Sequence, residues 1–130
     1  MLQKIQDNES KIHLIHGITG SGKTEIYLRL AAKKLTAGKQ TLILIPEISL
    51  TPQNTKYFQS FFGKDLVEVY HSRLNVTEQF KIWQKVKSKQ PVIIIGSRSS
   101  TFLPFQNLDL VIMDEEHDFA YKQDQNPRYH

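Results

Sequence analysis

The chain has 130 residues, of which 39% are hydrophobic and 23% charged, and its formal net charge is +4 at pH 7. This length suits one domain with its own core, and no apolar run approaches the roughly 20 residues needed to span a bilayer. The absence of cysteine excludes disulfides and thiolate zinc sites, while the mild positive charge is compatible with a polyanionic partner without requiring one.

Residues 1–10 are polar, and we expect them to be frayed. They lack the apolar segment of a signal peptide, so the expected location is the cytoplasm, with no membrane partner. From residue 11 onward, short apolar stretches alternate with helical patterns. Strands are predicted at 11–16, 41–45, 66–70, 91–96 and 108–114. Several of these stretches show no polar alternation, which is typical of parallel strands covered on both faces.

Helices with clear end signals are predicted between these strands. The first spans residues 23–37 and ends before Gly38, a residue type common just beyond helix ends. The second begins after Thr51 as the N-cap, has Pro52 in its first position, and ends at Gly63. The alternation of strand and helix predicts an α/β fold with a mostly parallel, doubly wound sheet.

A third helix is predicted after Asn75, with Glu78 placed to complete a capping box. Its apolar residues Phe80, Trp83 and Val86 recur every three positions, which predicts that they share one face of the helix.

A glycine-rich segment lies between the first predicted strand and the first predicted helix. It reads Gly17-Ile18-Thr19-Gly20-Ser21-Gly22-Lys23-Thr24 and matches the pattern G-x-x-x-x-G-K-S/T. Backbone N–H groups in such a loop point at nucleotide phosphates, and the following helix adds its positive end. Lys23 would reach the β- and γ-phosphates of ATP, and the Thr24 hydroxyl would ligate Mg²⁺. The alternative is a glycine turn that only connects strand and helix.

Acidic residues end the last predicted strand, where open α/β sheets place ligand-binding groups. Asp114 would hold Mg²⁺ through water, and Glu115 would orient or deprotonate the attacking water. Acids that merely solvate a strand end are one alternative. A transition-metal site of Asp114, Glu116 and His117 is another, although no second histidine stands at helical spacing.

Several stretches, in this order, resemble motifs I, Ia, Ib and II of superfamily 2 DEAH-type helicases: GITGSGKTEIYL, PEISLTPQ, GSRSS and DEEH. With YHSRL, the stretch joining motifs Ib and II, and YKQDQNPRYH, the chain from about residue 12 to 130 resembles the first motor lobe of the primosomal replication-restart helicases. The resemblance implies a RecA-like ATP-binding lobe at 11–130. In the intact enzyme, such a lobe couples ATP hydrolysis to movement on single-stranded DNA during restart of stalled forks.

The same resemblance assigns roles to matching positions. It implies that His117 couples nucleotide state to the second lobe and that the segment 46–53 lies against single-stranded DNA. The free N–H groups of a helix start suit a backbone phosphate there, as do the polar groups of the 96–99 turn. Aromatic and basic side chains mix beyond the acidic motif, as in single-strand binders. The residues expected to contact DNA are Thr51, Gln53, Ser97, Arg98, Tyr121, Lys122 and Arg128. The alternatives are a capped helix start, a surface turn and aromatic anchors of a loop.

The resemblance also implies parts that this sequence lacks, so we expect a truncated lobe. The absent parts are the motif III strand, the second lobe with its arginine finger, the N-terminal DNA-binding domain and a cysteine-rich segment that would hold zinc. Without the motif III strand, the sheet would close up, stay incomplete or take a strand from a neighbouring chain. Forked DNA and primosome proteins are expected partners through the parent protein. A phosphotransferase acting on a small molecule and a non-catalytic nucleic-acid-binding module remain alternatives.

Overall fold

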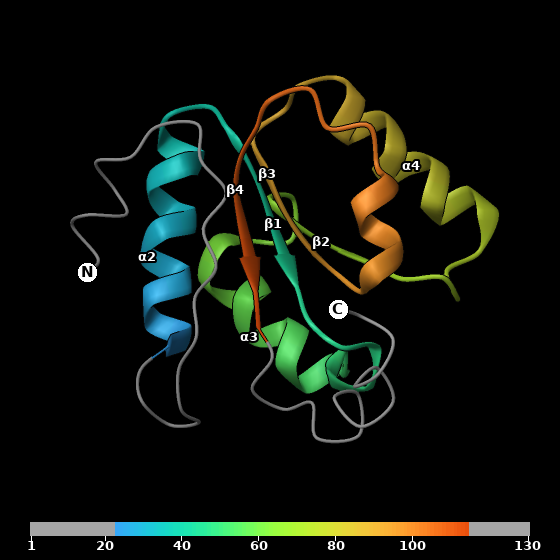
Figure 1. The fold of residues 1–130 in the computed structure, drawn as a ribbon, viewed down its shortest axis with the longest axis horizontal. Coiled ribbons are helices and arrows are strands. Elements are labelled where there is room, and N and C mark those ends of the chain that lie inside the picture. The colour runs from blue at the N-terminus through green and yellow to red at the C-terminus, as the bar shows by residue number, and fades with distance from the viewer. Residues whose placement is uncertain (1–22, 115–130) are drawn as a thin grey trace, which may run out of the picture.

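The computed structural model describes residues 23–114 as helices packed on a parallel sheet (Figure 1). The α-helices are α2 (Lys23–Thr36), α3 (Pro52–Phe62) and α4 (Val76–Lys87). Two short 3₁₀ helices, η1 (Glu47–Ser49) and η2 (Arg98–Phe102), follow strands. The strands are β1 (Gln40–Leu44), β2 (Val67–Tyr70), β3 (Val92–Gly96) and β4 (Leu108–Met113).

The four strands form one sheet in the order β2-β3-β1-β4, and every neighbouring pair is parallel. The prediction of a parallel α/β sheet is therefore confirmed for these strands. The strand predicted at 11–16 lies outside the described residues. Within residues 23–114, β4 forms one edge of the sheet, and the expectations about a missing strand beside it stay predictions.

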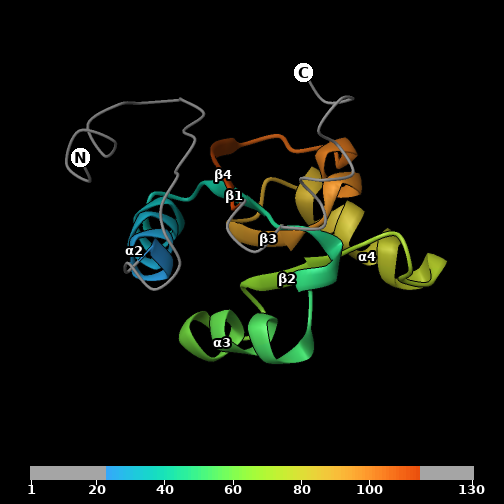
Figure 2. The same cartoon turned by 60° about the horizontal axis from the view of Figure 1, so that its bottom comes forward.

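The sheet separates two apolar cores, and Figure 2 shows α2 and α3 on one side with α4 and η2 on the other. This is the doubly wound arrangement expected from strands without polar alternation. The core beneath α2 and α3 contains Tyr27, Leu28, Leu30, Ala31, Ile43, Phe58, Val67, Ile93, Ile95, Leu110 and Ile112.

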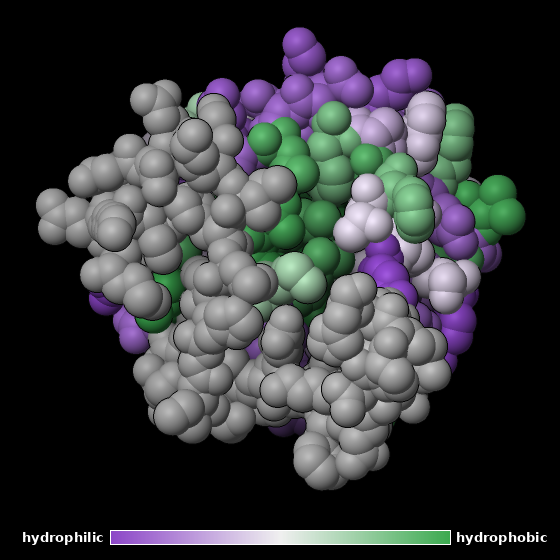
Figure 3. Space-filling model, in the orientation of Figure 1, coloured by the Kyte–Doolittle hydropathy of each residue, from purple (hydrophilic) through white to green (hydrophobic). Residues whose placement is uncertain are grey.

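The second core is smaller and only partly covered. Its buried members are Leu42, Ile82, Val86, Val92, Ile94, Leu103 and Val111. Partly buried residues packed against it are Leu44, Tyr70, Leu74, Phe105 and Leu108. Figure 3 accordingly shows an apolar area in the upper centre of the molecule, bordered by a hydrophilic rim along the top.

The predicted helix boundaries are confirmed, because local chemistry determines them. The Thr51 side chain accepts a hydrogen bond from the Asn54 N–H at 3.2 Å, ahead of Pro52. Before α4, Asn75 Oδ1 accepts from the Glu78 N–H at 2.8 Å and Glu78 Oε1 accepts from the Asn75 N–H at 3.2 Å. This reciprocal pair is the capping box expected from the sequence.

The prediction that Phe80, Trp83 and Val86 share one face of α4 is wrong, because Val86 lies on a different face from the other two. Val86 is buried, but Phe80 is 54% exposed and Trp83 is 37% exposed. The residue that shares the core with Val86 is Ile82, one turn earlier. Residues three apart drift steadily around a helix, so a run of such steps leaves the core face, whereas a step of four stays close to it.

A buried glutamine ties the amino end of β1 to its surroundings. The Gln40 side chain donates hydrogen bonds to the carbonyls of Val86 (2.8 Å) and Gln90 (3.0 Å). Its oxygen accepts from the N–H groups of Gln106 (3.2 Å) and Asn107 (3.0 Å). The amide therefore joins the end of α4 to the segment before β4, and its donors and acceptor are all used.

Candidate functional site

Because the strands are parallel, the segments that follow them meet at one edge of the sheet, which we call the carboxyl edge. The start of η1 follows β1, the turn of Ser97 and Arg98 follows β3, and Asp114 follows β4. Figure 1 shows that α2 begins at this same end of the sheet. An ion pair fixes α2 along β4, since Lys34 Nζ lies 2.7 Å from Asp109 Oδ2 with both side chains largely buried.

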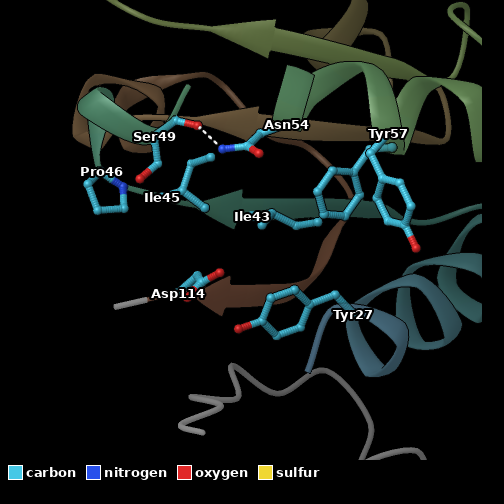
Figure 4. Close-up of a pocket in the computed structure, with 9 residues that line it drawn as sticks. Tyr27, Ile43, Ile45, Pro46, Ser49, Asn54, Tyr57 and Asp114 are labelled. Carbon is cyan, nitrogen blue, oxygen red and sulfur yellow. Dashed lines mark hydrogen bonds between the residues drawn. The ribbon is translucent and has the colours of Figure 1, made fainter. Parts of the chain in front are cut away.

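Asp114 lines a cleft of about 250 Å³. Its backbone N–H donates to the carbonyl of Leu44 at 2.9 Å, which continues the pairing of β4 with β1. Figure 4 shows Asp114 on one wall of the cleft, with the Tyr27 hydroxyl of α2 pointing toward it. The cleft is lined by Tyr27, Ile43, Ile45, Pro46, Ser49, Asn54, Tyr57, Phe58 and Asp114.

The cleft places Asp114 beside the segment from η1 to α3. Asn54 Nδ2 donates to the carbonyl of Ser49 at 2.9 Å, which holds η1 against the first turn of α3 (Figure 4). Thr51 uses its hydroxyl for the helix cap, and both Thr51 and Gln53 are exposed. One cavity is thus bordered by the acidic end of β4 and by the predicted DNA-contacting helix start.

The turn after β3 is held by its own polar groups. The Ser97 N–H donates to the carbonyl of Tyr70 at 3.2 Å, and Ser100 Oγ donates to the carbonyl of Ser97 at 2.6 Å. The Ser97 side chain is buried, and its hydroxyl lies 3.3 Å from that of Ser99. Arg98 is exposed. A ligand at this turn would therefore meet the guanidinium of Arg98 before the hydroxyl of Ser97.

Sequence reasoning assigned no role to the loop after β2, although it joins the carboxyl edge. Arg73 Nε lies 3.2 Å from Glu47 Oε2 of η1, and the Arg73 N–H donates to His71 Nδ1 at 3.1 Å. These contacts connect the YHSRL stretch to the PEISL stretch. In the sequence, this loop stands out only as the stretch YHSRL, one of those that carry the family resemblance.

Several predicted site residues lie outside the described residues. These are Gly17, Ile18, Thr19, Gly20, Ser21, Gly22, Glu115, His117, Tyr121, Lys122 and Arg128. Lys23 and Thr24 begin α2, but only their backbone is described. Residues 23–114 contain no cluster of three metal-ligating side chains, and the alternative metal site of Asp114, Glu116 and His117 extends beyond that range. In the described part of the chain, no helix is long and apolar enough to cross a membrane.

A family model described as DEAD/DEAH box helicase matches residues 2–130. The chain is also similar to proteins named replication restart protein PriA. It is 47% identical over 128 residues to that of Bacillus subtilis (strain 168), and 47% identical over 119 residues to that of Haemophilus influenzae (strain ATCC 51907 / DSM 11121 / KW20 / Rd). It is 48% identical over 118 residues to that of Synechocystis sp. (strain ATCC 27184 / PCC 6803 / Kazusa). These alignments cover 98%, 92% and 90% of this chain, but only 16%, 16% and 14% of the relatives.

Proposed function

This chain belongs to the DEAD/DEAH box helicase family, and from that membership we propose that it is the ATP-binding lobe, residues 11–130, of a DNA helicase that restarts replication. The main support for this proposal is the arrangement of the carboxyl edge. Asp114, the start of α3 and the Ser97–Arg98 turn all lie there, at the same end of the sheet as the start of α2. The parent protein would use ATP to move along single-stranded DNA at forks, with primosome proteins as partners. Zinc would belong to other parts of the parent, because this sequence has no cysteine.

In this proposal, the loop Gly17–Thr24 and the start of α2 hold the nucleotide. Lys23 neutralises phosphate charge and Thr24 offers its hydroxyl to Mg²⁺. Asp114 fits a magnesium site, because its carboxylate oxygens are the ligand type that Mg²⁺ prefers and it lines an open cleft. Bound MgATP would supply the phosphoryl bond whose cleavage drives movement. Glu115 would orient the attacking water, and His117 would pass the nucleotide state to a second lobe.

The DNA-contacting surface of this proposal lies along the carboxyl edge. In the first turn of α3, Pro52 has no N–H and the Asn54 N–H is used by the Thr51 cap, so the Gln53 N–H is the donor that a backbone phosphate can accept from. Arg98 would add a charge-assisted contact at the neighbouring turn. Ser97 would contribute through the turn that it forms with Ser99 and Ser100. Tyr121, Lys122 and Arg128 would extend this surface with aromatic and basic groups.

The test is ATP hydrolysis by the full-length parent protein, with and without single-stranded DNA. We expect hydrolysis to be stimulated by DNA and to fall about 100-fold or more in Lys23→Ala and in Glu115→Gln, because each change removes a group that stabilises or forms the transition state. Lys64→Ala is the matched control. Lys64 is exposed and lies just before β2, at the amino ends of the strands and therefore opposite the carboxyl edge. If the protein binds DNA equally well with and without ATP, and Lys23→Ala does not change that binding, the proposal is contradicted and a non-catalytic nucleic-acid-binding module is favoured.

A further inference from the structure

An open groove of about 260 Å³ lies between the end of β2 and the outer face of α4. It is lined by Tyr70, Val76, Gln79, Phe80 and Trp83. Val76 is 80% exposed, and the rings of Phe80 and Trp83 also reach solvent. Large apolar side chains that gather on the outside of a helix indicate a binding surface more often than isolated ones do.

The aromatic rings of this groove have the geometry of a stacking platform. Phe80 and Trp83 lie nearly parallel, with 6.3 Å between ring centroids and 10° between their planes. Lys87 Nζ lies 4.7 Å from the centroid of the Trp83 ring. Flat rings beside an ammonium group match the two parts of a nucleotide, because a base can stack on the rings while a phosphate pairs with the cation.

The charges around the groove favour an anionic occupant. The α4 sequence VTEQFKIWQKVK carries lysines at 81, 85 and 87 but only one acid, Glu78. The Glu78 carboxylate already accepts the Asn75 N–H, as part of the capping box. Lys85 pairs with Glu68 at 2.6 Å, which leaves Lys81 and Lys87 as the cations nearest solvent on this helix.

The groove also adjoins the carboxyl edge. The carbonyl of Tyr70, which lines the groove, accepts the N–H of Ser97 at 3.2 Å. The groove is therefore linked through Tyr70 to the turn that carries Arg98. We propose that it is a base-stacking site for single-stranded DNA whose backbone crosses this turn. This inference rests on the proposed function and extends its DNA-contacting surface to α4.

The test measures DNA affinity in the intact protein, by fluorescence anisotropy of a labelled oligo-dT strand. We expect Phe80→Ala to weaken binding about tenfold, because a stacked base contributes on that scale. Phe61→Ala is the matched control: it removes a similarly exposed, similarly stacked phenylalanine from the end of α3, and we expect no change in affinity. Thermal melting checks that both variants remain folded.

A second variant tests the charged half of the groove. Lys87→Gln should lower the slope of log affinity against log salt concentration by about 0.7, the value for one phosphate contact on a single strand. Lys64→Gln is its control at the opposite edge of the sheet, and its slope should be that of the unmodified protein.

The outcomes separate this inference from the proposed function. If the unmodified protein binds oligo-dT and Phe80→Ala binds it equally well, the stacking site is refuted while the helicase proposal stands. If Phe80→Ala instead loses binding only of an acidic peptide, the groove is a protein-docking site and the inference is wrong. If the unmodified protein binds no single-stranded DNA, both proposals fail together.

Discussion

Gly96 lies where three segments of the carboxyl edge come together. A Cβ atom at this position would lie 2.6 Å from the Cβ and Oγ of Ser100 and 2.8 Å from the carbonyl oxygen of Tyr70. The carbonyl of Gly96 also accepts the Ile45 N–H at 3.0 Å, so the backbone here is held from a second side. The close packing of β3, β2 and η2 therefore depends on the absence of a side chain.

We predict that Gly96→Ala destabilises the fold by about 1–3 kcal/mol, the usual cost of forcing an extra methyl group into a packed site. The measurement is urea unfolding followed by circular dichroism. Phe102, which is also in η2 and is 85% exposed, gives the matched control Phe102→Ala, which removes exposed atoms without creating a clash. Equal stabilities for the two variants would mean that η2 can shift without cost, and that the turn of Ser97 and Arg98 is not rigidly held.

At the scale of single elements, the start of α4 is held by one reciprocal cap. Asn75 and Glu78 each satisfy an N–H group of the other, in a first turn that has no other intrahelical acceptors for these groups. We predict that Asn75→Ala costs about 1 kcal/mol of unfolding free energy, the typical value for a lost N-cap, and that Asn75→Asp costs much less. Urea titrations of the two variants would check this. A cost for Asn75→Asp as large as for Asn75→Ala would show that the cap is not the cause.

Local signals explain why the helix ends could be predicted from sequence. Thr51 before Pro52, Asn75 before Glu78, and Gly38 at φ 79° each act within one turn of chain, so their neighbours in the sequence are also their partners in space. The same reasoning predicted the strands and their parallel pairing, because helical crossovers join them.

Features that depend on distant segments could not be predicted this way. Gln40 is fully buried and contacts residues 46 to 67 positions later in the chain, so its sequence neighbours gave no sign of its role. The strand order β2-β3-β1-β4 and the shared cleft of Tyr27 with Asp114 likewise depend on tertiary packing. The exposed face of α4 could not be predicted, because apolar residues spaced three apart do not show which face of a helix other segments will cover.

At the scale of the whole molecule, the strands of the sheet are protected unequally. The central strands β1 and β3 have hydrogen-bonded neighbours on both sides, and helices on both faces cover β3. Within residues 23–114, β2 pairs only with β3. Half of the backbone groups of an edge strand point away from the sheet, so they can open to water without disturbing their neighbour.

We predict that amide hydrogen exchange follows this order. Amides of residues 92–96 should exchange only through global unfolding, whereas residues 67–70 should exchange through smaller openings with a lower free energy. Hydrogen-exchange mass spectrometry with peptides that separate these two strands would measure the difference. Equal protection would indicate that another segment covers the free edge of β2, close to the groove beside Tyr70. Addition of oligo-dT provides a further comparison. DNA bound in the groove between β2 and α4 should slow amide exchange at residues 67–70 more than at residues 92–96.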